Sequence, residues 1–276
     1  MTSEARSAVE TAGELNAIIE KKGRLAAYEL ILFGMLAGIY IAFGAVAAST
    51  ITAHSQNLPP AVAKWLAGSV FCVGLILVVI PGSELFTGNI LMAAGLGIGK
   101  VGPGRLLRNW VGAYVGNFLG SLLLALVVFG SGLMGSPDNP TPLGKTAADI
   151  AASKIALDFF PAFFRGVLCN TLVCLAVILA LSSRTVAGKI LGIYFPIMTF
   201  VMCGFEHSVA NMYFLPAGLL AKGEFLSGFW SIWHNLIPVT LGNIIGGLSV
   251  ILLHPARVRQ FTRAMKPRGD SGGTSS

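Results

Sequence analysis

Two stretches of the sequence decide the fold, because each places a glycine, a glutamate and an asparagine in the middle of a long apolar segment. They are Gly82-Ser-Glu-Leu-Phe-Thr-Gly-Asn89 and Gly204-Phe-Glu-His-Ser-Val-Ala-Asn211. Both fit the pattern Gly-x-Glu-x-x-x-(Gly or Ala)-Asn. Glycine and proline disfavour continuous helix, and Pro81 directly precedes the first stretch. The sequence therefore predicts two helices that are each broken near the middle.

The composition places these broken helices in a membrane. Of the 276 residues, 54% are hydrophobic and only 11% are charged, whereas soluble domains carry about 25% charged residues. So few charges cannot cover a water-soluble protein of this size, which excludes a cytosolic enzyme, a disordered chain and a secreted disulfide-rich domain. No basic stripe with interleaved aromatic residues accompanies the net charge of +7, so we expect no nucleic-acid partner. The sequence predicts an integral membrane protein that contacts the lipid bilayer.

Six apolar runs are long enough to cross a membrane, which takes roughly 20 residues. The predicted spans are Leu30–Ala53, Trp65–Gly99, Asn109–Gly132, Ile155–Ser183, Ile190–Ala221 and Phe225–His254. The second and fifth are longer than one simple span and contain the two predicted breaks. Because the runs are continuous rather than alternating, a β-barrel is excluded. We expect an all-α membrane protein.

Lysines and arginines gather on one side of the predicted membrane. Fourteen of the 19 lie in the N-terminal segment, in two loops of the same side and in the C-terminal tail. By the positive-inside rule, both termini of this multi-pass protein are cytoplasmic and the membrane is the inner (plasma) membrane. We expect one membrane domain over 1–276, with an amphipathic cytoplasmic helix within 1–29, a six-span core at 30–254 and a disordered cytoplasmic tail at 255–276.

The chain also repeats itself outside the two broken stretches. The third and sixth predicted spans share the spacing Asn-x6-Gly-Asn-x2-Gly, which begins at Asn109 in one and at Asn235 in the other. Spans one to three therefore duplicate spans four to six. Because each unit has an odd number of crossings, the two units must lie in opposite orientations. Inverted repeats with matching broken helices are typical of transport proteins, whose path lies at the repeat interface.

These residues carry a resemblance to a known family. The two broken stretches, together with Asn235-Leu-Ile-Pro-Val-Thr-Leu-Gly-Asn243 and Leu36-Ala-Gly-Ile-Tyr-Ile-Ala-Phe-Gly44, resemble the signature stretches of the formate/nitrite transporter family. The resemblance covers residues 5 to about 255. It implies an aquaporin-like protomer of six helices with spans two and five broken, assembled as a homopentamer. It also implies one pore per protomer for a small monovalent anion, which is formate, nitrite or hydrosulfide in the known members.

The resemblance also implies which residues form the pore. A histidine just after the fifth-span break lies at the pore centre, which here is His207, and a threonine from the second-span break faces it, here Thr87. A lysine and an asparagine sixteen residues apart precede and enter the fourth span, as Lys154 and Asn170 do. The apolar constrictions of the family would fall on Phe71, Leu75, Leu85, Phe86 and Phe200.

The ionisable residues of the two stretches suggest separate roles. An ionisable residue at membrane depth is a functional candidate by default, and the His207 imidazole can donate a hydrogen bond or a proton to an anion. A bare carboxylate would repel an anion, so we expect Glu84 and Glu206 to be structural, each accepting hydrogen bonds from the backbone N–H groups of its own break; proton relay is the alternative. We expect Asn89 and Asn211 to close the breaks through side-chain hydrogen bonds.

Two cations near the fourth span receive different interpretations. Lys154 would raise the local concentration of anions at the outer mouth. Arg165 is expected to pair with Asp158 or to reach an interface, outside the pore. A bare anion pays a large desolvation cost in an oily constriction, so a weak acid would take up a proton between Lys154 and His207 and cross in neutral form.

The sequence thus predicts a channel or transporter for small anions of weak acids, with formate as the first candidate and possible proton coupling. Nitrite and hydrosulfide remain alternatives, because the segment from Gly82 to Gly88 is nearer to those members of the family. A neutral-solute pore of the aquaporin type is a second class, but the chain lacks paired Asn-Pro-Ala boxes. The scattered histidines form no catalytic or metal-ligand cluster, and no phosphate-binding loop is present, so we expect no enzyme activity, no cofactor and no metal.

Overall fold

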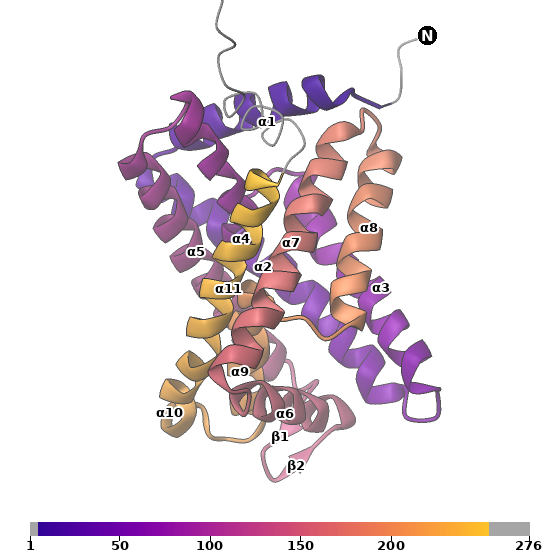
Figure 1. Ribbon diagram of the computed structural model, residues 1–276. Coiled ribbons are helices and arrows are strands. Elements are labelled where there is room, and N and C mark those ends of the chain that lie inside the picture. Colours follow the sequence, from indigo (N-terminus) through magenta and orange to yellow (C-terminus); the bar gives the residue numbers. More distant parts are fainter. Residues whose placement is uncertain (1–4, 254–276) are drawn as a thin grey trace, which may run out of the picture.

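The computed structural model describes residues 5–253 and is built almost entirely of helices (Figure 1). Within these residues, five helical segments are long and apolar enough to cross a membrane. They are α2 (Ala27–His54), α3 (Pro60–Val79), α5 (Pro103–Gly130), α7 (Phe159–Ser182) and the segment Phe225–Leu252. The last comprises α10 (Phe225–Gly228), η2 (Phe229–Ser231) and α11 (Ile232–Leu252). His254 and the expected tail at 255–276 lie outside the described residues.

The helical path is interrupted at both places where the sequence predicts breaks. After α3 ends at Val79, the chain resumes as α4 (Phe86–Asn89) and η1 (Ile90–Ile98). Likewise α8 (Val186–Met202) is separated from α9 (Ser208–Ala221). Gly82 and Gly204 have φ values of +89° and +71° within these gaps. Only glycine adopts such values readily, so one glycine in each gap turns the chain out of the helical path.

The helix α1 (Ala8–Gly23) lies across one end of the molecule (Figure 1). Ser7 and Glu10 form a capping box at its start, and the Arg6 guanidinium donates to the carbonyl oxygens of Leu181 and Ser183, 2.9 Å away in each case. The two hydrogen bonds from Ser7 and the nearby Arg184 lower the pKa of the Glu10 carboxyl below its usual range. This end of the chain is therefore attached to the end of α7.

A helix that the sequence analysis did not predict lies at the opposite end of the molecule (Figure 1). This is α6 (Pro142–Ile155), and a short hairpin of β1 (Gly135–Ser136) and β2 (Asn139–Pro140) precedes it. The hairpin pairs Gly135 with Pro140 and Ser136 with Asn139. The predicted fourth span, which was to begin at Ile155, begins instead at Phe159. The predicted third span begins at Pro103 rather than at Asn109, because proline at the first turn starts a helix without losing a hydrogen bond.

Glycines allow the long helices to approach closely. A Cβ atom on Gly116 of α5 would lie 2.5 Å from the carbonyl oxygen of Ile31 and 2.9 Å from the Cα of Gly34, both in α2. A Cβ atom on Gly166 of α7 would lie 2.7 Å from the carbonyl oxygen of Val239 in α11. Close backbone contact through small residues is typical of helix pairs in lipid, where burial of apolar surface does not drive association.

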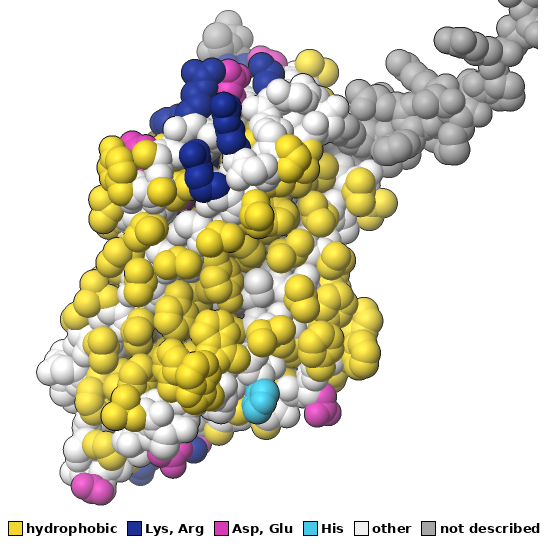
Figure 2. Space-filling model, turned by 90° about the vertical axis from the view of Figure 1, so that its left-hand side faces the viewer, with side chains coloured by type: hydrophobic (Ala, Val, Ile, Leu, Met, Phe, Trp, Pro, Cys, Tyr) yellow, Lys and Arg dark blue, Asp and Glu magenta, His cyan; other side chains and the backbone are white. Residues whose placement is uncertain are grey.

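The surface agrees with a multi-pass membrane protein. Large apolar side chains cover the flank of the molecule in Figure 2, and lysine and arginine side chains gather at the end where α1 lies. Such an apolar belt between charged ends is expected of a surface that faces lipid.

We expect Gly116→Ala to lower the stability of the folded protein in detergent. The added methyl group must displace the backbone of α2, and overpacking of this kind costs about 1–3 kcal/mol. Gly130→Ala is the matched control, because nothing lies within 4 Å of its Cβ position at the end of the same helix. Thermal unfolding of the purified variants measures the difference, and equal melting temperatures would contradict close packing at Gly116.

Candidate functional site

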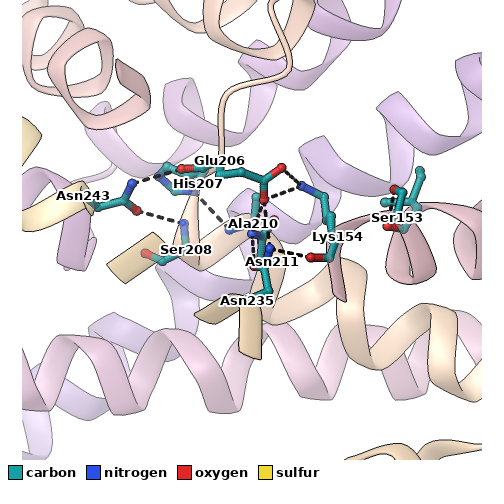
Figure 3. A network of polar contacts seen from close by, with 10 residues as sticks. Ser153, Lys154, Glu206, His207, Ser208, Ala210, Asn211, Asn235 and Asn243 are labelled. Atoms are coloured by element: carbon teal, nitrogen blue, oxygen red, sulfur yellow. Dashed lines mark hydrogen bonds and ion pairs between the residues drawn. The ribbon is translucent and has the colours of Figure 1, made fainter. Parts of the chain in front are cut away.

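The break between α8 and α9 is held by a buried ion pair. Lys154, at the end of α6, donates from Nζ to both oxygens of the Glu206 carboxylate at 2.9 Å (Figure 3). The Nδ2 atom of Asn211 donates to the same carboxylate at 2.7 Å, and Asn235 of α11 approaches it at 3.5 Å. The side chains of Lys154 and Glu206 are 15% and 5% exposed. Removing either charge would leave the other buried without a counterion.

A second network of the same kind holds the break between α3 and α4. Lys22 of α1 donates to Oε1 of Glu84 at 2.7 Å and to the side-chain oxygen of Asn89 at 2.9 Å. Asn89 and Asn109 donate to the other carboxylate oxygen of Glu84, at 2.7 and 3.3 Å. The sequence analysis missed Lys22. The internal repeat could have identified it, because Lys22 precedes Gly34 by the same 12 residues that separate Lys154 from Gly166.

Asparagine side chains from neighbouring helices satisfy the backbone at both breaks. Oδ1 of Asn243 accepts a hydrogen bond from the N–H of Ser208 at 2.9 Å, and its Nδ2 donates to the carbonyl oxygens of Gly166 and Glu206 at 2.8 and 3.0 Å (Figure 3). Asn243 therefore joins the start of α9 to α7 and to the preceding chain.

Asn117 of α5 does the same at the other break. Its Oδ1 accepts from the N–H of Phe86, and its Nδ2 donates to the carbonyl oxygens of Gly34 and Glu84, all at 2.8–2.9 Å. The predicted backbone partners of the two carboxylates were therefore wrong. Each break presents both N–H donors and carbonyl acceptors, and an amide side chain can pair with both, whereas an ionised carboxylate can pair only with the donors.

The predicted pore residues His207 and Thr87 meet across the two breaks. Their Nε2 and Oγ1 atoms lie 2.9 Å apart, and both side chains are buried. The backbone N–H of Ala210 donates to Nδ1 of His207 at 3.0 Å. Because a backbone N–H only donates, Nδ1 must be the acceptor, and the proton of the neutral ring lies on Nε2. The imidazole thus presents a fixed N–H donor toward Thr87.

The structure places Asn170 beside Thr87 and away from the Lys154 ion pair. Its Nδ2 atom donates to the carbonyl oxygens of Thr87 and Asn243 at 3.2 and 2.7 Å. No hydrogen bond joins Asn170 to Lys154 within residues 5–253, so the two residues that share the family spacing have separate surroundings.

The five side chains predicted to form constrictions are all buried. The ring of Phe200 stacks on the imidazole of His207 with centroids 5.8 Å apart, and Phe71 packs edge-on against Phe200 at 5.6 Å. Leu75 lies one helical turn after Phe71. Leu85 and Phe86 directly precede Thr87, where Phe86 packs against the rings of Trp110 and Tyr114. Apolar side chains therefore adjoin both partners of the histidine–threonine contact.

A cavity of about 410 Å³ extends to His207 from the end of the molecule that carries α6. We call it the vestibule. Its lining includes Phe71, Lys154, Phe200, Glu206 and His207. The cavity thus adjoins the lysine–glutamate pair and reaches the buried imidazole that stacks on Phe200. Within the described chain, no three His, Cys, Asp or Glu side chains cluster to hold a metal ion.

The comparisons with known proteins cover most of the chain and agree with one another. The family model for formate/nitrite transporters matches residues 9–256. A probable formate transporter of Methanothermobacter thermautotrophicus is 44% identical over 261 residues, which cover 90% of this chain and 94% of the relative. The formate channel FocA of Haemophilus influenzae is 38% identical over 231 residues, covering 78% and 81%. A solved pentameric formate channel with formate bound is 34% identical, covering 86% of this chain and 98% of its own, with a TM-score of 0.73.

We expect Lys154→Met to destabilise the protein strongly, because it leaves the Glu206 carboxylate buried and unpaired. Breaking a buried pair costs about 3–5 kcal/mol. The double variant Lys154→Met/Glu206→Gln should recover most of that loss, and thermal unfolding in detergent reports both. Arg24→Gln is the control, since it removes a cation from an exposed pair with Glu20, where the cost is at most about 1 kcal/mol. Equal instability of the single and double variants would argue against a buried ion pair.

Proposed function

The chain belongs to the formate/nitrite transporter family, and on that premise we propose that it is a membrane channel whose substrate is formate. The names of its relatives support this choice, because two of those described above are a probable formate transporter and a formate channel. Nitrite and hydrosulfide are the alternatives within the same family. No enzymatic step is part of the proposal.

The proposed architecture is an inverted repeat of six spans. In this proposal α3 with α4 and η1 forms the second span, and α8 with α9 forms the fifth. Two observations support the inversion. The ion pair at one break uses a lysine from α1 and the pair at the other uses a lysine from α6, and these helices lie at opposite ends of the molecule (Figure 1). Matching asparagines, Asn117 and Asn243, satisfy the two breaks.

Assembly and orientation follow from the same reasoning. We propose a homopentamer, supported by the similarity to a solved pentameric formate channel. The end that carries α1 is proposed to face the cytoplasm, because lysine and arginine gather there (Figure 2). The vestibule, near α6, would then open on the outer side of the membrane.

The observation that carries the transport proposal is the buried contact between His207 and Thr87. An anion that loses its water beside the rings of Phe71 and Phe200 meets the Nε2–H of His207, which can donate a hydrogen bond where the substrate is least hydrated. Because stripping water from a bare anion is costly, we propose that the acid crosses in neutral form after taking up a proton. Glu206 does not repel the anion in this scheme, since Lys154 balances its charge.

We expect formate uptake into proteoliposomes to rise as the external pH falls from about 7.5 to about 5.5, because a carboxylic acid takes up more protons as the pH falls toward its pKa. His207→Ala should lower uptake about tenfold or more, which corresponds to about 1.4 kcal/mol in the barrier. His54→Ala is the matched control, because His54 is an exposed histidine at the end of α2.

The comparison must include nitrite, hydrosulfide and glycerol at both pH values. Formate uptake that is indifferent to pH and to His207→Ala would contradict proton coupling through this site. Passage of glycerol without formate would instead support a neutral-solute pore.

A further inference from the structure

The vestibule is lined by two cations in addition to its lysine–glutamate ion pair. Its charged lining consists of Lys64, Lys154, Arg165 and Glu206. Lys154 donates two hydrogen bonds of 2.9 Å to Glu206. The opposite charges of the pair therefore nearly cancel at the position of an approaching anion. The attraction must therefore come from Lys64 and Arg165.

Arg165 does not have the partner that the sequence suggested. No hydrogen bond or ion pair to its guanidinium is found within residues 5–253, and the expected pair with Asp158 is not formed. Its backbone is nevertheless held in place, because its carbonyl oxygen accepts a hydrogen bond from the N–H of Glu206 at 3.2 Å. Arg165 is thus attached to the residue that precedes His207, it belongs to the lining of the vestibule, and its guanidinium has no partner in the described chain.

Two residues of the vestibule lining each carry a buried polar atom that has no hydrogen-bond partner in the described chain. The two atoms are the hydroxyl oxygen of Ser49, in α2, and Oδ1 of Asn211. The residues are only 2% and 0% exposed, and a buried polar group without a partner is costly. The Ser49 hydroxyl can rotate to donate a hydrogen bond to an anion. The wall of the vestibule therefore contains a hydroxyl group whose hydrogen bond is not used within the described chain.

We propose that the vestibule holds an anion-binding site ahead of His207, in which the Arg165 guanidinium selects planar anions with two oxygens, such as formate and nitrite, over anions with one acceptor atom, such as hydrosulfide and chloride. The guanidinium presents its N–H donors in a flat fork that matches two coplanar oxygens, whereas a lysine ammonium acts as a point charge. This inference rests on the proposed anion transport and narrows its substrate class. Ser49 supplies a further donor, and Lys64 contributes long-range attraction.

The test compares Arg165→Lys with Arg165→Gln in proteoliposomes of the full chain. Arg165→Lys keeps the charge and loses the fork, so the KM for formate and nitrite should rise about fivefold to tenfold, as expected for loss of a bidentate hydrogen bond. The KM for hydrosulfide should stay unchanged. Arg165→Gln should raise the KM for all three anions. The maximal rate at saturating formate should change little, because His207 and Thr87 are intact.

Lys145→Gln is the matched control, because it removes an exposed cation from α6 that does not line the vestibule. It should leave all three KM values as in the wild type. An Arg165→Lys variant with wild-type KM for formate and nitrite would overturn the proposal, as would an equal rise for hydrosulfide, because a purely structural role would not distinguish the anions.

The outcome is separable from that of the transport proposal. Wild-type liposomes that carry none of the three anions would contradict transport alone. In that case, calorimetric measurement of sodium formate binding to the purified protein tests whether the vestibule binds the anion through Arg165. Affinity that falls about fivefold or more in Arg165→Lys supports bidentate recognition, and affinity equal to the wild type refutes it.

Discussion

The structure depends on a buried lysine–glutamate pair at each helix break. A chain that leaves the helical path inside a membrane exposes backbone groups that lipid cannot satisfy. Here a glutamate enters each gap, and a lysine from a short helix outside the bundle neutralises it. An asparagine from a long helix then completes the backbone hydrogen bonds. The break is therefore a rigid element whose polar groups are satisfied by distant parts of the chain.

This arrangement explains how carboxylates can lie close to the proposed anion path. An unpaired glutamate beside His207 would repel the substrate by direct Coulomb interaction. Pairing with Lys154 removes that repulsion and also fixes the chain on which His207 stands. Lys154 thus holds the break in place, a role that its position in the sequence does not reveal. The pairing also means that Lys154 is not a free charge for attracting anions, a role that we propose for Lys64 and Arg165 of the vestibule.

The two breaks cooperate to form the site itself. Thr87 follows one break and His207 lies in the other, and their side chains meet at 2.9 Å. A backbone amide holds Nδ1 of the imidazole as an acceptor, so the opposite nitrogen is the donor. The proton position on His207 is therefore set by the geometry of the break. The ring of Phe200 stacks on this buried imidazole, and a hydrogen bond in such low-dielectric surroundings is stronger than one in water.

The sequence by itself determined the membrane setting, the positions of the two breaks and the membership of the family, because apolar length and a glycine in each gap act locally. It also pointed to His207 and Thr87 through a motif. Only the tertiary structure decided that Lys22 neutralises Glu84, 62 residues away, and that Asn117 and Asn243 serve the backbone. It also revealed α6 and left Arg165 without Asp158. These contacts join residues that are far apart in the sequence. They depend on how the helices pack, which a local sequence pattern does not specify.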